Sequence, residues 1–191
     1  MQAARMIAAL AAGLLAAAPA LSAEKGKAAG SKEQVKRGEY LVNYGGCNDC
    51  HTPKIMGPNG PAPDPARLLS GHPASATLPA VPPGVVGPNP DQWAAITNAD
   101  LTAWAGPWGT SYAANLTPDV ATGLGGWTAD QFIKTMRTGK HLGAGRPILP
   151  PMPWFDLAVL NDGDLKAVFA YLKSVKPIKN QVPPPAPPKG P

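Results

Sequence analysis

The residues best suited to chemistry stand together in the run Cys47-Asn48-Asp49-Cys50-His51, which holds both cysteines and one of the three histidines of the chain. Two thiols separated by two residues can each form a thioether with one vinyl group of a porphyrin. The histidine that follows is then carried under the ring, where it can bind the iron. The run therefore predicts one covalently attached haem c, bound through Cys47 and Cys50, with His51 as the first axial ligand.

A Cys-x-x-Cys pair also occurs in disulfides, in zinc sites and in thioredoxin-like redox centres. A zinc site needs further ligands at short spacing, and the other two histidines, His72 and His141, are isolated in the sequence. A thioredoxin-like site needs flanking strands in a βαβ pattern, which we do not find. The haem interpretation is therefore favoured over these three alternatives.

The composition indicates a fold with little regular core. The chain contains 25 prolines and 21 glycines among 191 residues, and 6% of its residues are aromatic. So much proline and glycine approaches the level at which irregular structure dominates. A large planar cofactor buried in a single domain would supply part of the missing apolar interior. We therefore expect the chain to fold poorly without its cofactor.

The first 23 residues have the features of a secretory signal. Arg5 precedes an apolar run over residues 6–18, and small residues follow up to Ala23. Because the apolar run is short for a membrane span, we predict a signal peptide over 1–23, a polar linker over 24–30 and a periplasmic location. An uncleaved segment that associates with the membrane is the alternative.

The formal net charge is +5, from 17 basic and 12 acidic side chains. A mildly basic surface suits an acidic protein partner, and it equally suits simple solvation. The lysines are scattered, and the sequence contains no phosphate-binding glycine loop and no basic cluster of the kind that binds nucleic acid. We therefore expect no nucleic-acid partner.

Helical signals begin before the cysteine run. Ser31 and Gln34 have the spacing of a capping box, and the helix that they begin is expected to end at Gly45-Gly46. Gly38 interrupts this helix, and a glycine inside a helix costs about 1 kcal/mol relative to alanine. Its presence predicts that another helix approaches closely at this point.

Two further helices are predicted near the C-terminus. Thr128 and Gln131 form a second capping box, and the helix that follows ends at Gly139. Asn161 caps the last helix, which Pro177 ends. The apolar residues of this last helix keep helical spacing: Leu165, Val168, Phe169, Leu172 and Val175.

Segment 52–118 has no persistent hydrophobic period, and we predict only short helical pieces at 65–69 and 90–96. Its large aromatic side chains are expected to pack the segment against the domain: Trp93, Trp104, Trp108 and Tyr112. The tail, residues 177–191, is rich in proline and is predicted to be an extended, solvent-exposed spacer.

Four more runs accompany the cysteine run: Arg37-Gly38-Glu39-Tyr40-Leu41-Val42, Asn115-Leu116-Thr117-Pro118-Asp119, Gly125-Gly126-Trp127-Thr128 and Pro150-Pro151-Met152-Pro153-Trp154. Together they resemble the single-haem class I cytochromes c and, more narrowly, the cytochrome c domains associated with bacterial periplasmic dehydrogenases. The resemblance covers roughly residues 32–183. It implies an all-α cytochrome c fold over 31–176, in which the first and last helices cross and set Gly38 against Phe169 or Tyr171. A long Pro/Gly-rich insert, residues 52–114, departs from the smallest members of the family.

The resemblance also implies that Met152 is the second axial ligand of the iron. The residues favour the same choice, because prolines stiffen the loop around Met152, whereas Met136 lies on an apolar helix face and Met56 lies in a Gly/Pro-rich loop. His141 and His72 are the alternatives. A thioether opposite an imidazole raises the reduction potential of the iron.

Run 69–71 resembles the Leu-x-Gly of the haem-packing loop in this family. We expect a carbonyl of this loop to accept a hydrogen bond from the His51 ring, which would fix the orientation of the imidazole.

The predicted function is one-electron transfer by an electron-transfer protein, with no substrate chemistry and no catalytic residue. The expected partners are a periplasmic dehydrogenase as donor and an oxidase or another cytochrome as acceptor, in small transient contacts. One alternative is a haem c enzyme of the peroxidase or sulfur-oxidising type, which needs an open sixth position. Another is an electron-transfer subunit of a membrane-associated dehydrogenase complex, with the proline-rich tail as a tether.

Overall fold

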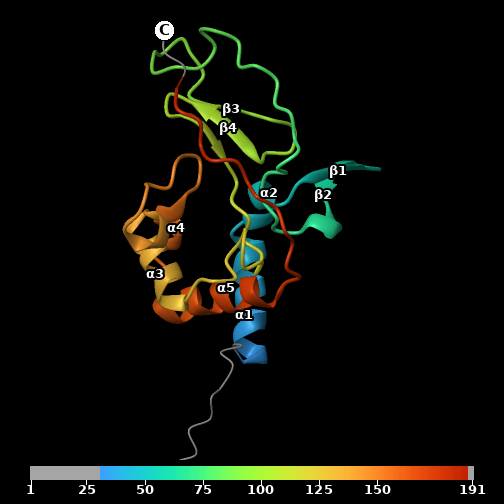
Figure 1. Cartoon of the computed structure of the whole chain (residues 1–191), viewed down its shortest axis with the longest axis vertical. Coiled ribbons are helices and arrows are strands. Elements are labelled where there is room, and N and C mark those ends of the chain that lie inside the picture. Colours follow the sequence, from blue (N-terminus) through green and yellow to red (C-terminus); the bar gives the residue numbers. More distant parts are fainter. Residues whose placement is uncertain (1–30, 189–191) are drawn as a thin grey trace, which may run out of the picture.

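The first and last long helices cross and form the frame of the domain (Figure 1). Helix α1 spans Lys32–Tyr44 and helix α5 spans Asp162–Ser174. The computed structural model describes residues 31–188, so the predicted signal peptide and linker lie outside the described residues. The crossing of α1 and α5 is the arrangement that the resemblance implied.

Gly38 makes the crossing possible. A Cβ atom at this buried position would collide with the carbonyl group of Ala167 and would lie 2.8 Å from the Cβ of Tyr171. The two helix backbones can therefore approach closely only because no side chain stands between them. The predicted close approach and the contact with Tyr171 are confirmed, while Ala167 rather than Phe169 supplies the nearest atoms.

A bidentate ion pair holds the same two helices together at their edges. The Arg37 guanidinium donates from Nε to Oδ1 of Asp164 at 2.8 Å and from Nη2 to Oδ2 at 3.2 Å. These hydrogen bonds hold the pKa of the Asp164 carboxyl below its usual value. Because the Arg37 side chain is half exposed, water weakens the attraction, and the pair adds orientation more than stability.

The predicted helix ends are largely confirmed. The Ser31 hydroxyl accepts from the backbone N–H of Gln34 at 3.2 Å, and α1 ends at Tyr44 with Gly45 as its cap. Helix α3 (Ala129–Thr138) begins with the complete capping box of Thr128 and Gln131. It ends at Gly139, whose positive φ of 63° is easily adopted only by glycine.

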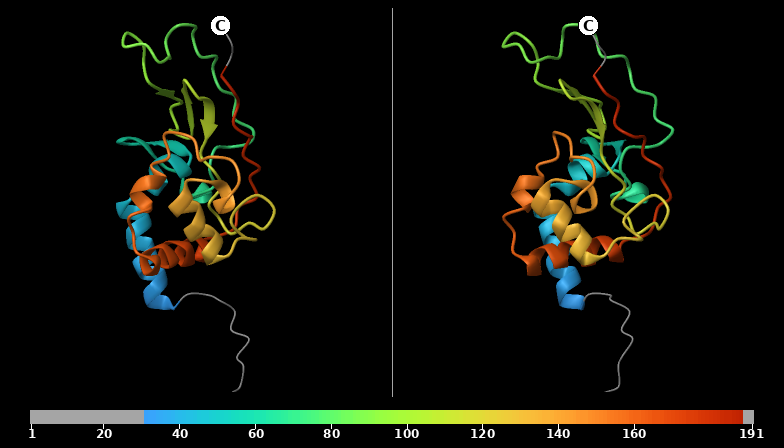
Figure 2. Two further views of the ribbon diagram at one scale, coloured as in Figure 1. Left: turned by 90° about the vertical axis from the view of Figure 1, so that its left-hand side faces the viewer. Right: turned by 60° about the vertical axis from the view of Figure 1, so that its left-hand side comes forward.

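Helices α1, α3 and α5 gather at one end of the molecule, below the strands (Figure 2). Helix α3 packs against α5, against the short helix α4 (Trp154–Leu157) and against the 3₁₀ turn η2 (His141–Gly143). The buried apolar cluster between them consists of Val42, Leu69, Leu124, Phe132, Met136, Leu165, Val168, Phe169, Tyr171 and Leu172. Met136 is thus a core residue, as its position on the helix predicted.

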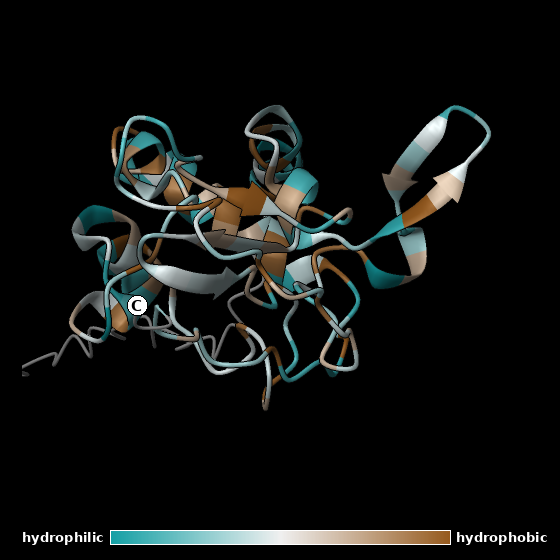
Figure 3. Ribbon diagram, turned by 90° about the horizontal axis from the view of Figure 1, so that it is seen from above, coloured by the Kyte–Doolittle hydropathy of each residue, from teal (hydrophilic) through white to brown (hydrophobic). Residues whose placement is uncertain are grey.

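Five short strands form two small antiparallel sheets, so the expectation of an all-α fold is wrong in this respect. Strands β1 (Lys54–Gly57) and β2 (Gly60–Pro63) form a hairpin that projects from the body of the domain (Figure 3). Strands β3 (Ile96–Thr97), β4 (Ala103–Gly106) and β5 (Gly109–Tyr112) pair in that order. The domain is mostly helical with a few short strands.

The other predictions for segment 52–118 have mixed outcomes. A 3₁₀ turn, η1 (Pro65–Arg67), confirms the short helical piece near 65–69. The piece at 90–96 is wrong, since Trp93 instead forms a parallel bridge with Val86. The side chain of Trp93 is 70% exposed and does not pack against the domain. Pro88 and Pro90 stand near the start of this stretch, and proline favours turns over the interior of a helix, which explains the difference.

The described part of the proline-rich tail, residues 177–188, is not a free spacer. Residues 177–188, here called the C-terminal strap, run from the end of α5 to the three-stranded sheet (Figure 1). The backbone of Ala186 exchanges two hydrogen bonds with Thr110 of β5, at 2.8 and 2.9 Å. The tail is extended as predicted, but in this part it is bonded to the domain.

Replacing Gly38 by Ala is expected to lower the free energy of unfolding by about 1–3 kcal/mol, the usual cost of forcing an extra group into a packed contact. Denaturant unfolding of the haem-loaded protein measures the change. Gly126→Ala is the matched control, because a Cβ there meets no atom within 4 Å, and a surface change of this kind stays within about 0.5 kcal/mol. Equal stability of the two variants would contradict the role assigned to Gly38.

Candidate functional site

The cysteine run forms its own short helix, α2 (Cys47–His51). Gly46 precedes it with a φ of 65°, a left-handed conformation that turns the chain out of α1. In a helix, residues three and four positions apart lie on the same face. Cys47, Cys50 and His51 are therefore presented on one side of α2.

Both cysteines are free thiols and both are half-buried. Burial raises the pKa of the Cys47 thiol to about 11. Burial also raises the pKa of the Cys50 thiol, while contact with Trp104 of β4 opposes this effect. Both shifts favour the protonated thiols, and no disulfide joins Cys47 and Cys50 in the structure.

A zinc site is also disfavoured. Within residues 31–188, no group of three or more histidine, cysteine, aspartate or glutamate side chains lies close enough together to hold a metal ion. Zinc in a structural site needs four such ligands. The two thiols and the imidazole of α2 do not by themselves complete such a set, and the spacing of the thiols is consistent with covalent haem c.

The His51 ring is buried, at 8% exposure, and its orientation is fixed by one hydrogen bond. Its Nδ1 lies 2.8 Å from the carbonyl oxygen of Ala114. A carbonyl can only accept, so Nδ1 carries the proton and Nε2 keeps a free lone pair. Burial lowers the pKa of His51 and favours the neutral ring, which is the form that binds metals.

The acceptor for His51 is not in the loop that we expected. The carbonyl comes from Ala114, while the 69–71 loop contacts His51 differently, through the Gly71 N–H donating to the His51 backbone carbonyl at 2.8 Å. Ala114 follows strand β5, 63 residues from His51. No local sequence signal marks a backbone carbonyl at that distance as the partner.

Two polar side chains that the sequence analysis missed support α2. The Lys54 ammonium donates to the carbonyl oxygens of Asn48, Asp49 and Thr52, at 3.2, 2.8 and 2.6 Å. It thereby satisfies carbonyls that a helix end leaves without partners. The Thr52 hydroxyl accepts from the backbone N–H of Leu69 at 2.8 Å, which ties the helix end to the next loop.

Met152 is half-buried in the proline-flanked loop before α4. The loop is anchored where the Ser111 hydroxyl of β5 donates to the carbonyl of Pro150 at 2.5 Å. Ser111 lies three residues before Ala114, and three extended residues span about 10 Å. One stretch of chain therefore holds both the His51 ring and the Met152 loop, and the two side chains lie near each other.

The two alternative histidines have different surroundings. His72 is 1% exposed, its Nδ1 lies 2.9 Å from the Thr102 hydroxyl, and its ring packs against Tyr112 at 4.9 Å. His141 is exposed and meets the edge of Trp127 at 5.0 Å. Both rings thus already have protein partners in the structure.

The helices α1 and α5 cross, and a Cys-x-x-Cys-His helix follows α1 in the chain. This combination is that of a c-type cytochrome domain. No protein-family model matches the chain. The gluconate 2-dehydrogenase cytochrome c subunit of Pantoea cypripedii is 32% identical over 145 residues, which cover 75% of this chain and 24% of the relative. The cytochrome c subunit of the alcohol dehydrogenase (quinone) of Gluconobacter oxydans is 28% identical over 148 residues, which cover 77% of this chain and 23% of the relative.

A third relative, the fructose dehydrogenase cytochrome subunit of Gluconobacter japonicus, is 36% identical over 77 residues, which cover 40% of this chain and 16% of that protein. The chain thus spans about a quarter or less of the length of these relatives. It belongs to the c-type cytochromes and is homologous to cytochrome c subunits of bacterial dehydrogenases.

A variant with both Cys47→Ser and Cys50→Ser is expected to lose all covalently bound haem, because no thiol remains to form a thioether. Mass spectrometry of the exported, denatured protein measures this, since denaturation removes only the haem that is not covalently bound. The control is Met56→Leu, which removes a sulfur atom at an 80% exposed position of β1. This control should keep the mass of one added haem. An exported wild-type chain with the mass of the bare polypeptide would contradict the site.

Proposed function

We propose that this protein is a periplasmic one-electron carrier with one haem c bound covalently through Cys47 and Cys50 and with His51 and Met152 as axial ligands. The observation that carries the proposal is the pair of free thiols beside a buried imidazole whose Nε2 is unprotonated. The haem, when bound, supplies an iron that passes between the ferrous and ferric states.

The residues of the chain determine how that iron behaves. The Ala114 carbonyl orients the His51 ring and makes it more electron-rich, as hydrogen-bond partners of metal-bound histidines do. Met152 would hold the iron together with His51, and its thioether would favour the ferrous state and raise the reduction potential. Two protein ligands of this kind would keep small molecules from the iron, which favours electron transfer over substrate chemistry.

The partners in the proposal follow from the relatives, which are named as cytochrome c subunits of gluconate and alcohol dehydrogenases and as the cytochrome subunit of a fructose dehydrogenase. We infer that a dehydrogenase outside the cytoplasm supplies the electrons and that an oxidase or a second cytochrome receives them. Contacts of this type are small, below about 1,200 Å². Within residues 31–188, none of the helices combines the length and the apolar character needed to cross a membrane.

A second candidate is a permanent electron-transfer subunit or domain of a dehydrogenase complex. The relatives favour it, since each is a subunit and each is several times longer than the stretch matched here. Copurification with a dehydrogenase in a constant ratio would support this candidate. A monomer that is reduced by the dehydrogenase and then leaves it supports the mobile carrier.

Replacing Met152 by Ala is expected to abolish the sulfur-to-iron charge-transfer band of the ferric protein and to let carbon monoxide bind the ferrous protein at neutral pH. The reason is that the variant leaves the sixth position of the iron without its sulfur ligand. Visible spectroscopy of both oxidation states measures the two effects.

The control is Met136→Leu, which keeps a core side chain of similar volume and should leave both spectra unchanged. A Met152→Ala spectrum identical to that of the wild type would remove Met152 from the proposal. Carbon monoxide binding to the wild-type protein would favour the alternative of a haem enzyme with an open sixth position.

A further inference from the structure

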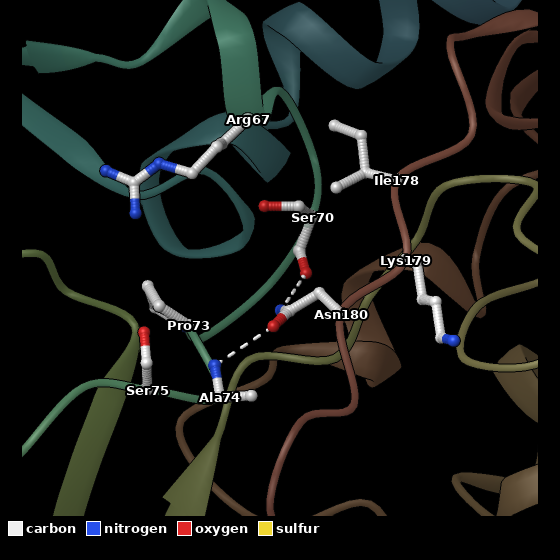
Figure 4. Close-up of a pocket in the computed structure, with 8 residues that line it drawn as sticks. All are labelled: Arg67, Ser70, Pro73, Ala74, Ser75, Ile178, Lys179 and Asn180. Carbon is white, nitrogen blue, oxygen red and sulfur yellow. Dashed lines mark hydrogen bonds between the residues drawn. The ribbon is translucent and has the colours of Figure 1, made fainter.

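Asn180 of the C-terminal strap forms a network that the proposed function does not by itself require. Its side-chain nitrogen donates to the carbonyl oxygens of Ser70 and His72, at 2.7 and 2.8 Å. Its side-chain oxygen accepts from the backbone N–H of Ala74 at 2.9 Å. Figure 4 shows the Asn180 side chain pointing from the strap to the loop that contains Ser70 and Ala74. A carboxamide, with two N–H donors and one oxygen, matches this set of partners, and a carboxylate does not.

The loop held by Asn180 is bonded directly to the His51 region. The Gly71 N–H donates to the His51 carbonyl at 2.8 Å, and the His72 N–H donates to the Ala113 carbonyl at 2.9 Å. The next residue along the chain, Ala114, accepts the hydrogen bond of the His51 ring. Asn180 is therefore connected through two successive hydrogen bonds to the backbone of His51 and to the stretch that orients its ring.

The strap holds the same strand at two more points. Just after Ala114, the buried Asn115 side chain donates to the Ile178 carbonyl at 2.8 Å. Ala186 pairs with Thr110, the neighbour of the Ser111 that anchors the Met152 loop. The strap thus contacts Thr110 and Asn115. These two residues flank Ser111, which holds the Met152 loop, and Ala114, which holds the His51 ring.

A cavity of about 240 Å³ that is open to solvent lies beside Asn180, between the strap and the loop at 70–75 (Figure 4). The side chains that line this cavity do not fill it. Removal of the amide nitrogen would therefore leave the Ser70 and His72 carbonyls to water.

We propose that Asn180 is a positioning residue for the axial ligands, and that the strap sets the distance between the His51 ring and the Met152 loop. This inference rests on the proposed His51 and Met152 ligation. The strap acts through the strand from Thr110 to Asn115, and it touches neither ligand. Loosening it would let the stretch from Thr110 to Asn115 shift, so that the Ala114 carbonyl and the Ser111 hydroxyl would lose their fixed positions and Met152 would be held less firmly as a ligand.

The test is Asn180→Asp, which keeps the size of the side chain and an acceptor for Ala74 but removes both donated hydrogen bonds. The affinity of the ferric holoprotein for added imidazole is measured, since imidazole binds only when the methionine is displaced. We expect the affinity to rise by roughly fivefold or more, the lower range of energetic coupling between separate sites, and the charge-transfer band to weaken.

The matched control is Gln181→Glu, the same amide-to-carboxylate change at the next residue, whose exposed side chain makes no hydrogen bond within the described residues. It should leave the imidazole affinity within about twofold, because in the part of the chain that the structure describes the Gln181 side chain has no hydrogen bond through which it could be coupled to the axial ligands. If Asn180→Asp does not fold, Ala186→Pro tests the same inference, because it removes only the N–H donated to Thr110.

A variant that unfolds at lower temperature but keeps the wild-type band and imidazole affinity would show that the strap only stabilises the fold, which overturns the inference. A wild-type protein that lacks the band would contradict the methionine ligation itself. The two failures are therefore distinguishable in one set of spectra.

Discussion

The hydrogen bond between the His51 ring and the Ala114 carbonyl is the constraint on which the site depends. It joins the cysteine helix to the stretch that follows strand β5, 63 residues further along the chain. It also selects the tautomer whose free nitrogen faces away from the carbonyl. Because Ser111, on the same stretch, anchors the Met152 loop, one short piece of extended chain relates the two sides of the site to each other.

Hydrogen bonds of buried polar side chains join segments that a larger apolar core would hold together in other domains. Asn115, Thr117 and Thr52 are buried, and each makes hydrogen bonds to segments far away in the sequence. Within residues 31–188, every buried side-chain nitrogen or oxygen has a partner. Irregular backbone leaves many N–H and C=O groups without helix or sheet partners, and these side chains satisfy some of them. This is how a chain so rich in proline and glycine builds an ordered site.

Signals within a few residues of each other in the sequence, such as helix caps, predicted the helices. Contacts between residues far apart in the sequence could not be predicted. The caps at Thr128 and Asn161 involve residues three positions apart, and both are present. Gly38 indicated a close helix contact because a glycine in that position otherwise costs stability. The acceptor for His51 and the role of Asn180 could not be predicted, since each depends on a carbonyl brought in from a distant loop. The strands were missed because they are two to four residues long and lack alternating apolar residues.

The long sequence separation of the contacts that the strap makes has a consequence for folding. The hydrogen bonds of the Asn180 side chain join residues 106 to 110 positions apart, and forming contacts so distant in sequence requires the closure of long loops, which slows folding. The cysteine helix α2, which contacts the neighbouring helix α1, can therefore form before the strap is in place.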